Sequence, residues 1–354
     1  MTADAVGGVF TYARELTSGL ADEGFDVVLV VLGPAPSRAQ ARALGALPLA
    51  SYHQLTCALE WMPDPRGDVE RSGALLLEVA HEEEIDLVHL NGYAHAALAF
   101  GVPLLVCGHS CVLSWHEAVR RRPAGPEWNA YRDAVERGLR EADVLVAPTQ
   151  ALLDDLVRLY RPSCELQVIP NGLDAVRLRP LAREPYVLGA GRVWDEAKNL
   201  LALDRVAPSL PWRVVIAGDA ADLEPTSAEF LGHVPAVALE HLLGHAGIYA
   251  APARYEPFGL GVLEAGLAGC PLVLGDIPSL RELWDGAAVF VDPFDDDALR
   301  HALTWLIDDE AERARLAVAA RRRALGYPRA RMAGAYARLY ARLTVSAAAP
   351  AVAR

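Results

Sequence analysis

IYAAPARYEPFGLGVLEAGLAG, residues 248–269, is the stretch that decides the fold of this chain. Its first residues, 248–251, form a short apolar run that suits a buried parallel strand. Residues 262–269 suit a helix, so the sequence predicts a turn at 258–261 between the strand and the helix. A strand that leads through a turn into a helix is half of a βαβ unit and indicates an α/β fold.

The same alternation continues on both sides of this stretch. Further short apolar runs that suit buried strands lie at 27–32, 87–90, 104–107, 144–147, 168–169, 186–189, 213–217, 272–274 and 289–291. Helical patterns separate them, for example at 8–23, 128–140 and 298–306. This alternation predicts doubly wound parallel sheets with helices on both faces, and there are enough strands for two such sheets.

Length and punctuation predict two domains. A chain of 354 residues exceeds one compact core and suits two cores of ordinary size. Prolines and glycines recur in residues 171–185, as is typical of a linker. We therefore expect Rossmann-like domains at 1–170 and 171–328, followed by a helix at 329–345 and a frayed, low-complexity tail at 346–354.

The glycine pair Gly7-Gly8 comes too early for a full strand to precede it. A doubly wound domain normally begins with a strand that leads into its first glycine loop. Residues 1–4 provide only the end of such a strand, so we expect the natural start to lie upstream and Met1 to be internal. The alternative is a sheet that tolerates a shortened first strand.

Composition narrows the class of protein. The net charge of −13, from 33 basic and 46 acidic residues, argues against a general nucleic-acid binder. No stretch has the apolar length of a transmembrane helix, and the opening residues do not form a signal peptide. We therefore expect a cytoplasmic protein with at most peripheral membrane contact.

Two residue types bear on possible ligands. The only dense basic cluster lies at 120–122, which we interpret as a solvated helix end, with contact to a membrane or an anionic acceptor as the alternative. The five cysteines are scattered and show neither a disulfide framework nor a CxxC metal pair. Cys107 and Cys111 lie four apart, and we interpret them as small buried residues after a strand, with a metal or redox site as the alternative. No metal site is expected.

The turn before the helix at 262–269 is a candidate anion site. Amide groups at a helix N-terminus lack intrahelical partners, and the helix dipole favours an anion there. Gly259 and Gly261 let a phosphate approach the backbone. Glu264 lies about one turn into the helix, where it could bond a ribose hydroxyl. The alternative is that Glu264 only complements the dipole and Gly259 only makes the turn.

The segment 189–199 carries a second candidate site. It follows a predicted strand and precedes a helix, so Arg192 and Lys198 lie on the kind of loop where open α/β sheets bind ligands. Two cations suit a diphosphate leaving group, whose growing charge they stabilise. The alternative is a pair of surface cations matched by Asp195 and Glu196. Lys198 is the only lysine in an arginine-rich chain, which favours a function.

Segments along nearly the whole chain resemble family 4 glycosyltransferases of the GT-B type. The matching segments are AVGGVFTYARELTSGLADEGFDV (5–27), EADVLVAPTQ (141–150), VIPNGLD (168–174), GRVWDEAKN (191–199) and the run from 233 to 284. Glu256 and Glu264 match the paired-glutamate signature of the family. The resemblance implies two Rossmann-like domains that face a central cleft, with the helix at 329–345 crossing back to the first domain.

The resemblance also implies roles for single residues. Gly8 should offer its amide near the phosphates or the donor sugar. Arg192 and Lys198 should hold the diphosphate, although their spacing is one residue longer than the commonest family spacing. Val234 should meet the base through its backbone, and Glu256 should face the donor sugar.

Further positions follow from the same resemblance. Phe258, Gly259 and Leu260 should line the sugar and phosphate, and Glu264 should hold the ribose. His109 should point into the cleft near the anomeric carbon. The alternative for His109 is a satisfied core histidine, but its place after the predicted strand at 104–107 favours a function.

The implied reaction is hexose transfer from a nucleoside-diphosphate sugar, most simply a UDP- or GDP-sugar, with retention of anomeric configuration. The domain at 171–328 would bind this donor, and the domain at 1–170 would bind a sugar, lipid or small-molecule acceptor. No cofactor is required. Alternatives are a GT-B sugar-nucleotide 2-epimerase or hydrolase, and an inactive nucleotide-sugar-binding protein.

Acceptor contacts are less defined. Trp61, Trp115 and Trp128 could stack on a sugar acceptor, although such residues more often belong to a core or an interface. Asn91 and Gly92 follow a predicted strand at a position where acceptor-side residues often lie in the resembling family.

Overall fold

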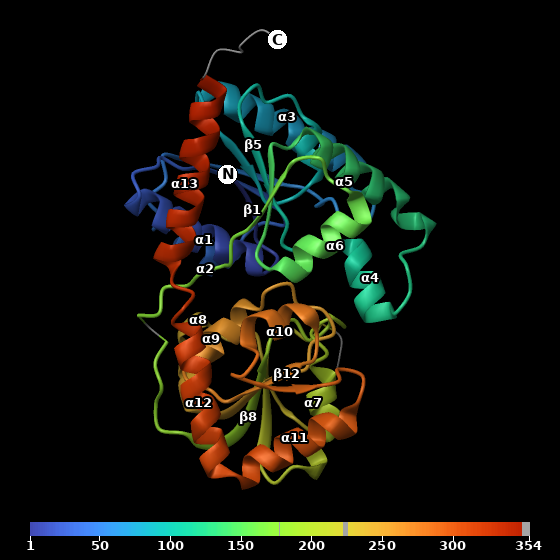
Figure 1. Cartoon of the computed structure of the whole chain (residues 1–354), viewed down its shortest axis with the longest axis vertical. Helices are drawn as coiled ribbons and strands as arrows, with labels where there is room; N and C mark the ends of the chain where they lie inside the picture. Colours follow the sequence, from blue (N-terminus) through green and yellow to red (C-terminus); the bar gives the residue numbers. More distant parts are fainter. Residues whose placement is uncertain (177, 222–225, 349–354) are drawn as a thin grey trace. The chain divides into compact units, whose positions relative to one another are not determined.

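The computed structural model describes residues 1–176, 178–221 and 226–348, and these divide into two compact units. The N-terminal unit comprises residues 1–117, 122–172 and the segment from 329 onward. The C-terminal unit comprises residues 118–121 and 173–328. In each unit helices lie on both sides of the strands (Figure 1).

The N-terminal unit contains two parallel sheets. The first has the order β1-β2-β3 and the second has the order β4-β5-β6-β7. The strands are β1 (Thr2–Asp4), β2 (Val28–Gly33), β3 (Ser51–Thr56), β4 (Val88–Leu90), β5 (Leu104–Cys107), β6 (Val144–Ala147) and β7 (Glu165–Val168). The helices are α1 (Gly8–Asp22), α2 (Arg38–Leu44), α3 (Arg66–Glu82), α4 (Val112–Arg120), α5 (Asn129–Glu141), α6 (Gln150–Tyr160) and α13 (Arg329–Ala348), with short 3-10 helices at Ala94–Ala97 and Pro126–Trp128.

Strands β1 and β4 lie side by side, so the two sheets continue one another. Asn91, directly after β4, joins them: its amide nitrogens donate to Thr2 in β1, from the backbone to Oγ1 (2.8 Å) and from the side chain to the carbonyl oxygen (2.6 Å). The chain proceeds outward from β1 to β3 on one side and from β4 to β7 on the other. The junction of β1 and β4 is therefore the point where strand order reverses.

Helices α1 and α13 pack against each other in this unit (Figure 1). Gly19 of α1 faces Ala333 of α13, and a Cβ on Gly19 would lie 2.5 Å from the Ala333 Cβ. The last helix extends to Ala348, three residues past the predicted end at 345, because an alanine-rich sequence favours helix. Of the predicted tail at 346–354, residues 349–354 lie outside the described residues.

The C-terminal unit has one parallel sheet in the order β10-β9-β8-β11-β12-β13. Its strands are β8 (Glu184–Ala190), β9 (Arg213–Ala217), β10 (Glu229–Gly232), β11 (Ala246–Ala251), β12 (Leu272–Gly275) and β13 (Val289–Val291). Its helices are α7 (Leu201–Val206), α8 (Ala236–His245), α9 (Leu260–Leu267), α10 (Pro278–Trp284), α11 (Asp296–Asp308) and α12 (Glu310–Ala324), with a 3-10 helix at Ala207–Ser209.

Both faces of this sheet are buried. Tyr186 and Leu188 of β8 pack into the apolar layer that contains Leu263 of α9. Val187, between them, packs into the opposite layer with Leu303 of α11. Because successive side chains of a strand point to opposite faces, continuous apolar runs are what a sheet covered on both faces requires. The predicted α/β fold with parallel sheets and helices on both faces is confirmed.

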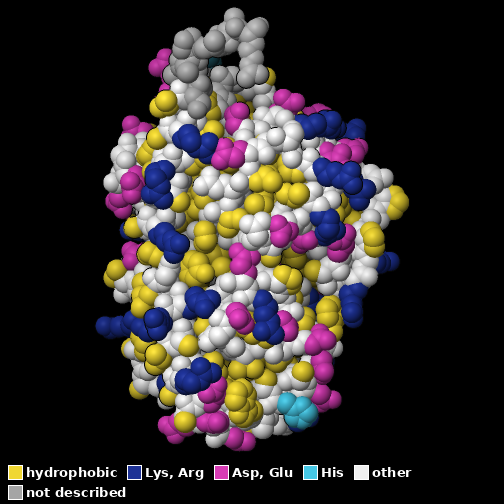
Figure 2. All heavy atoms as spheres, viewed as in Figure 1, with side chains coloured by type: hydrophobic (Ala, Val, Ile, Leu, Met, Phe, Trp, Pro, Cys, Tyr) yellow, Lys and Arg dark blue, Asp and Glu magenta, His cyan; other side chains and the backbone are white. Residues whose placement is uncertain are grey.

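Charged side chains of both signs are scattered over the side of the molecule that is drawn in Figure 2. Figure 2 shows acidic and basic side chains interspersed on that face of the molecule, without a concentrated basic region. Across residues 1–176, 178–221 and 226–348, no helix is both long enough and apolar enough to cross a bilayer.

Candidate active site

The candidate site of the C-terminal unit lies where β8 and β11 end. These parallel strands are neighbours, with Tyr249 opposite Leu188. From β8 the sheet continues to β9, and from β11 it continues to β12, so the strand order reverses between them. Ligands of open α/β sheets bind at the carboxyl ends of strands at such a reversal.

A close backbone approach positions the loop after β8. The amide of Gly191 donates to the carbonyl oxygen of Ala217 in β9 (3.0 Å). Gly218 has a φ of +148°, and a Cβ there would lie 1.7 Å from the Gly191 carbonyl oxygen. Only glycine permits this approach, so Gly218 fixes the path of the loop that carries Arg192 and Lys198.

Arg192 is paired within its own loop. Its guanidinium donates to Asp195 (2.7 Å) and lies 5.4 Å from the ring of Trp194. The predicted alternative, in which Asp195 matches the nearby cation, therefore describes the contact that Arg192 makes. Asp195 also accepts from the amide of Ala197 (3.0 Å), which ties the carboxylate to the turn.

Lys198 has a partner on the other loop. Its ammonium donates to the carboxylate of Glu256, and neither Asp195 nor Glu196 takes that place. Both side chains keep some exposure, 25% for Lys198 and 16% for Glu256. Lys198 is also the only lysine of the sequence, all other basic residues being arginines.

Hydrogen bonds to backbone carbonyl groups hold the two loops in place. The carbonyl oxygen of Ala197 accepts from the amide of Arg254 (2.8 Å), and Ser279 donates its hydroxyl to the carbonyl oxygen of Glu256 (2.6 Å). Asn199 donates from its side-chain amide to the carbonyl oxygen of Pro252 (3.0 Å). The pairing of Lys198 with Glu256 thus rests on a fixed backbone frame.

Helix α9 begins beside this pair. Gly259 precedes it with a φ of +86°, a left-handed conformation that glycine adopts without strain. The amide of Leu263 donates to the Gly259 carbonyl oxygen (3.0 Å), so the amides before it lie at the open N-terminus of the helix. The helix starts at Leu260, two residues earlier than predicted, because Gly259 completes the turn.

Glu264 and Glu256 both lie near Tyr249. Burial, and then the proximity of these two carboxylates, raises the pKa of the Tyr249 phenol well above its ordinary value. A Cβ on Gly261 would lie 3.2 Å from the Tyr249 hydroxyl oxygen. The two predicted glutamates therefore gather around one buried tyrosine of β11, beside the start of α9.

Three further predicted residues lie around this region. Val234 lies between β10 and α8, at the same carboxyl edge of the sheet. Phe258 is buried in the core, with its ring edge-on to Tyr327 at 5.9 Å between centroids. If Phe258 lines the sugar and phosphate, it does so with its backbone, because its side chain is buried. Leu260, the first residue of α9, is partly buried.

Gly8 and His109 belong to the N-terminal unit. Gly8 is the exposed first residue of α1, and Tyr12 follows one turn later on the same helix. The ring of Tyr12 meets His109 edge-on, with 4.4 Å between ring centroids. His109 lies two residues after β5, so α1 and the sheet together position it.

Desolvation keeps His109 neutral. Although part of its surface is accessible, burial lowers the pKa of its imidazole to about 3. Nε2 lies 2.7 Å from Oδ1 of Asn91, and the amide nitrogen of Asn91 already donates to Thr2. Oδ1 is thus the acceptor, and Nε2 of His109 carries the proton that it receives. The other ring nitrogen, Nδ1, is then the basic one.

Sequence reasoning missed some residues that position these groups. Tyr12 and Tyr249 look like ordinary core aromatics in the sequence, and their contacts emerge only from long-range packing. Gly218 had a signal, since a glycine directly after a predicted strand marks a possible close approach. In the part of the chain that the structure describes, no three His, Cys, Asp or Glu side chains form a metal-binding group.

Two family models match the chain, one in each half. The model described as Glycosyltransferase Family 4 matches residues 6–177. The model described as Glycosyl transferases group 1 matches residues 182–323, which include both loops of the candidate site.

Curated relatives match most of the chain. Glycogen synthase of Mycobacterium tuberculosis H37Rv is 28% identical over 362 residues, which cover 90% of this chain and 86% of that protein. D-inositol 3-phosphate glycosyltransferase of Xylanimonas cellulosilytica is 30% identical over 372 residues, which cover 90% of this chain and 88% of the relative.

Solved structures share the fold. Anabaena Alr3699/HepE in complex with UDP-glucose has a TM-score of 0.77 at 19% identity, over 97% of this chain and 100% of that chain. Sucrose-phosphate synthase from Thermosynechococcus elongatus has a TM-score of 0.75 at 19% identity, over 95% and 93%. These likenesses confirm the predicted GT-B class of fold. With family models on both halves and a 30% identical relative along most of its length, the chain belongs to the group 1, family 4 glycosyltransferases.

Proposed function

We propose that this enzyme transfers a hexose from a nucleoside-diphosphate sugar to an acceptor hydroxyl with retention of anomeric configuration. UDP- and GDP-sugars are the first candidate donors. The observation that carries the proposal is the pairing of Lys198 with Glu256 beside the open N-terminus of α9. A cation, a carboxylate and open helix amides at one strand reversal suit a substrate that joins a diphosphate to a sugar.

In this proposal Arg192, Lys198 and the amides near Gly259 bind the diphosphate. Asp195 and Glu256 already hold the two cations at the site, so little rearrangement is needed when the phosphates replace these partners. Fixed cations and helix amides stabilise the charge that grows on the departing diphosphate. That HepE was solved with UDP and with UDP-glucose supports a donor of this class.

The remaining donor contacts follow the same proposal. Glu256 faces the hexose, with Leu260 and the backbone of Phe258 along the sugar and phosphate. Glu264 binds the ribose hydroxyls from within α9, since a carboxylate accepts both hydroxyl protons. Val234 meets the base through its backbone.

In this proposal the N-terminal unit binds the acceptor. Gly8 offers its amide near the phosphates or the donor sugar, and His109 lies near the anomeric carbon. The acceptor oxygen forms the new bond to the anomeric carbon as the bond from that carbon to the diphosphate oxygen breaks. The proton of the acceptor hydroxyl passes to the leaving diphosphate, on the same face of the sugar. His109, uncharged at neutral pH, accepts or donates a hydrogen bond near the anomeric carbon without adding charge.

A thermal-shift screen tests the donor site. UDP, GDP, ADP and dTDP, with their glucose and mannose conjugates, are added to the wild type, Lys198→Ala and Glu264→Ala. A ligand that binds only the folded protein raises Tm by mass action. We expect one nucleotide series to stabilise the wild type and both variants to lose most of that shift.

Arg205→Ala is the matched control, because Arg205 is a cation of the same unit that pairs with Asp296 (2.6 Å) on α7 and α11. This variant should keep the full shift. If Lys198→Ala keeps it as well, the donor site is elsewhere. Once the donor is known, the anomeric proton coupling of the product distinguishes retention from inversion, and donor consumption without an acceptor would instead indicate an epimerase or hydrolase.

A further inference from the structure

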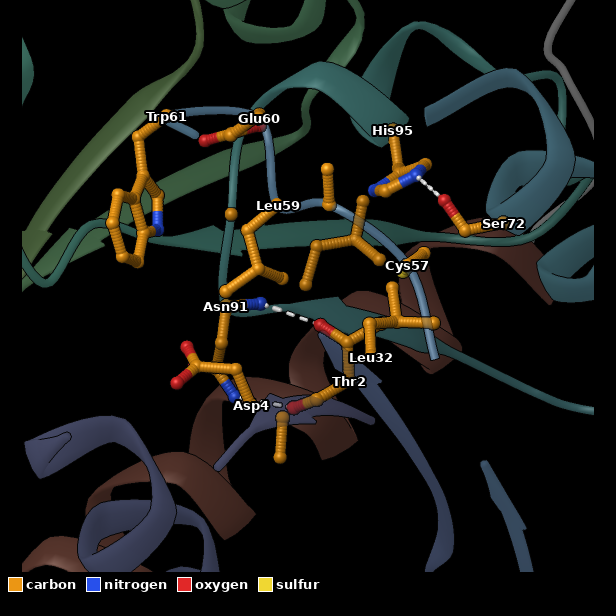
Figure 3. A pocket seen from close by; sticks show the side chains of 14 residues that line it. Thr2, Asp4, Leu32, Cys57, Leu59, Glu60, Trp61, Ser72, Asn91 and His95 are labelled. Carbon is orange, nitrogen blue, oxygen red and sulfur yellow. Dashed lines mark hydrogen bonds between the residues drawn. The ribbon is translucent and has the colours of Figure 1, made fainter. Parts of the chain in front are cut away.

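A cavity of about 60 Å³ opens in the N-terminal unit, at the carboxyl ends of its strands (Figure 3). Asp4 ends β1, Asn91 follows β4, and Glu60 and Trp61 lie on the segment that leaves β3. The cavity therefore sits at the reversal of strand order between β1 and β4. This is the kind of position where an open α/β sheet binds a ligand, and none of the donor residues above lines it.

The polar groups of the cavity wall are held in fixed positions. Glu60 accepts from the backbone amides of Tyr93 (3.1 Å) and Ala94 (2.6 Å). Asp4 accepts from the amide of Val6 (2.8 Å). Ordered carboxylates of this kind are preorganised to receive hydrogen bonds from ligand hydroxyl groups.

An aromatic surface accompanies these carboxylates. Trp61 is 39% exposed, so a face of its indole remains available for contact. In Figure 3, Trp61 and Asp4 flank one end of the cavity as viewed, and the bonded pair Ser72 and His95 flanks the other. An indole beside hydrogen-bonding groups suits a sugar or polyol, whose C–H groups pack on the ring while its hydroxyls bond at the edges.

The charged side chains that line the cavity are all acidic. Asp4 and Glu60 are acidic, and no lysine or arginine is among the described residues that line the cavity. Burial raises the pKa of the Glu60 carboxyl group, and the hydrogen bonds from the amides of Ala94 and Tyr93 oppose that rise by favouring the carboxylate. His95 bonds to Ser72 (2.8 Å), and burial lowers the pKa of its imidazole, so it adds no positive charge at neutral pH. A phosphate group placed here would meet two carboxylates and no cation, and like charges at close range oppose binding.

The cavity is also connected to His109. Asn91 lines the cavity, and its Oδ1 lies 2.7 Å from Nε2 of His109. A ligand in the cavity is thus one residue removed from the histidine that the proposed function places near the reacting carbon. This contact links the cavity to the residue that the proposed function places beside the acceptor.

We infer that this cavity receives a hydroxyl-bearing edge of the acceptor, and that the acceptor group bound there is an uncharged sugar or polyol rather than a phosphorylated one. The inference rests on the proposed function, because it names the second substrate of that reaction. It also separates the activities for which two relatives are named, glycogen synthase and D-inositol 3-phosphate glycosyltransferase, by the charge of the acceptor group.

The test uses the full chain and matched acceptor pairs. Glucose and glucose 6-phosphate, myo-inositol and inositol 3-phosphate, and maltotetraose with its phosphorylated counterpart are offered with each UDP- and GDP-hexose. Product formation is followed by mass spectrometry, and kcat/KM is compared within each pair. We expect the uncharged member to be preferred by roughly tenfold or more.

Variants assign the preference to the cavity. Asp4→Asn and Glu60→Gln remove one charge each and keep an oxygen for the amides that they bind. In the double variant, the ratio of kcat/KM for the uncharged member to that for the phosphorylated member should fall by roughly tenfold, because both repelling charges are removed. Glu82→Gln, an exposed charge at the end of α3, is the control and should leave the preference unchanged.

Each result decides the inference. A preference for the phosphorylated member, a preference that survives the double variant, or transfer to no member of any pair while nucleotide still raises Tm would overturn it. Failure of the proposed function is separate, since it would appear as the absence of any nucleotide-induced shift in the wild type.

Discussion

Lys198 donates a hydrogen bond to the carboxylate of Glu256, although 58 residues separate them along the chain. The pair brings a cation from the loop after β8 to a carboxylate from the loop after β11. In the proposed reaction these two groups have different tasks, since the cation binds phosphate and the carboxylate binds sugar. Removing one or the other should therefore give different results.

Lys198→Ala should weaken binding of the stabilising nucleoside diphosphate by roughly 10- to 100-fold, the range for a charge-assisted hydrogen bond. Glu256→Gln should keep this affinity or strengthen it slightly, because Lys198 loses its carboxylate partner and is freer to bind phosphate. Its kcat should nevertheless fall. Calorimetric titration with the diphosphate and initial rates measure the two effects, and an equal loss of affinity in both variants would contradict the assigned roles.

The single lysine also offers a direct probe of the site. Reductive methylation with ¹³C-formaldehyde labels amines and keeps their positive charge. The labelled protein should give one lysine signal, from Lys198, besides that of the α-amino group. We expect this signal to move on addition of the nucleotide and to be absent from Lys198→Arg. A signal indifferent to a nucleotide that raises Tm would place the phosphates away from Lys198.

Gly259 and Gly286 provide a matched pair for the turn into α9. Both have a positive φ, +86° and +76°, so alanine at either should cost about 1–2 kcal/mol of unfolding free energy. A Cβ at Gly259 would also lie 3.2 Å from Cγ of Glu256, whereas nothing lies within 4 Å of one at Gly286. Gly259→Ala should therefore lose nucleotide binding, while Gly286→Ala should keep it. Equal nucleotide affinity in the two variants, measured by calorimetry, would argue against a phosphate at this turn.

The central strands were predictable from the sequence because both faces of each are buried. Continuous apolar runs gave the bounds of the central strands β5, β6 and β9 as they occur in the structure, and also those of the edge strand β13. The missed strands are β3, whose SYHQLT alternates between half-buried and exposed residues, and β10. Both lie at a sheet edge, where solvent on one side permits polar residues and removes the apolar signal.

The candidate site was predictable in position but not in its pairings. Glycines and charges after strands marked the loops that carry Lys198 and Glu256, because the carboxyl ends of parallel strands meet at one edge. The sequence suggested local partners for both cations. Arg192 has such a partner in Asp195, but the partner of Lys198 depends on sheet order and lies on another loop. A single sequence contains no local signal for a contact of that kind.

The packing of α1 on α13 predicts that a glycine-to-alanine substitution in α1 lowers the unfolding free energy, whereas such substitutions in helices usually raise it. Glycine to alanine within a helix ordinarily stabilises a protein by up to about 1 kcal/mol. Gly67 lies near the start of α3, and a Cβ there would meet nothing within 4 Å, so Gly67→Ala should follow that rule. Gly19→Ala should instead destabilise by about 1–3 kcal/mol, because its Cβ would meet that of Ala333 at 2.5 Å. Denaturant midpoints of the two variants measure the contrast, and a stabilised Gly19→Ala would mean that the helices can separate at little cost.

His109 should make stability depend on pH. Its pKa is about 3 in the folded protein and near 6.5 when unfolded, so between these values the unfolded chain binds a proton that the folded chain does not. The contribution is fully present above pH 6.5 and is lost as the pH falls toward 3. The slope is up to about 1.4 kcal/mol of unfolding free energy per pH unit. His109→Asn should reduce the slope by up to that amount.

His89 and His95 also have pKa values lowered by burial, so the wild-type slope contains their contributions too, and only the difference between proteins reports on His109. His81→Asn, at an exposed position near the end of α3, is the control for the substitution itself. Unfolding free energies measured between pH 6.5 and about pH 5 should give parallel lines for the wild type and His81→Asn, and a shallower line for His109→Asn. A His109→Asn line parallel to the other two would show that the imidazole is hydrated enough to accept a proton in the folded enzyme. In the proposed reaction, a charged His109 would then lie near the reacting groups at mildly acidic pH, and transfer activity in that range should change with its protonation rather than stay level.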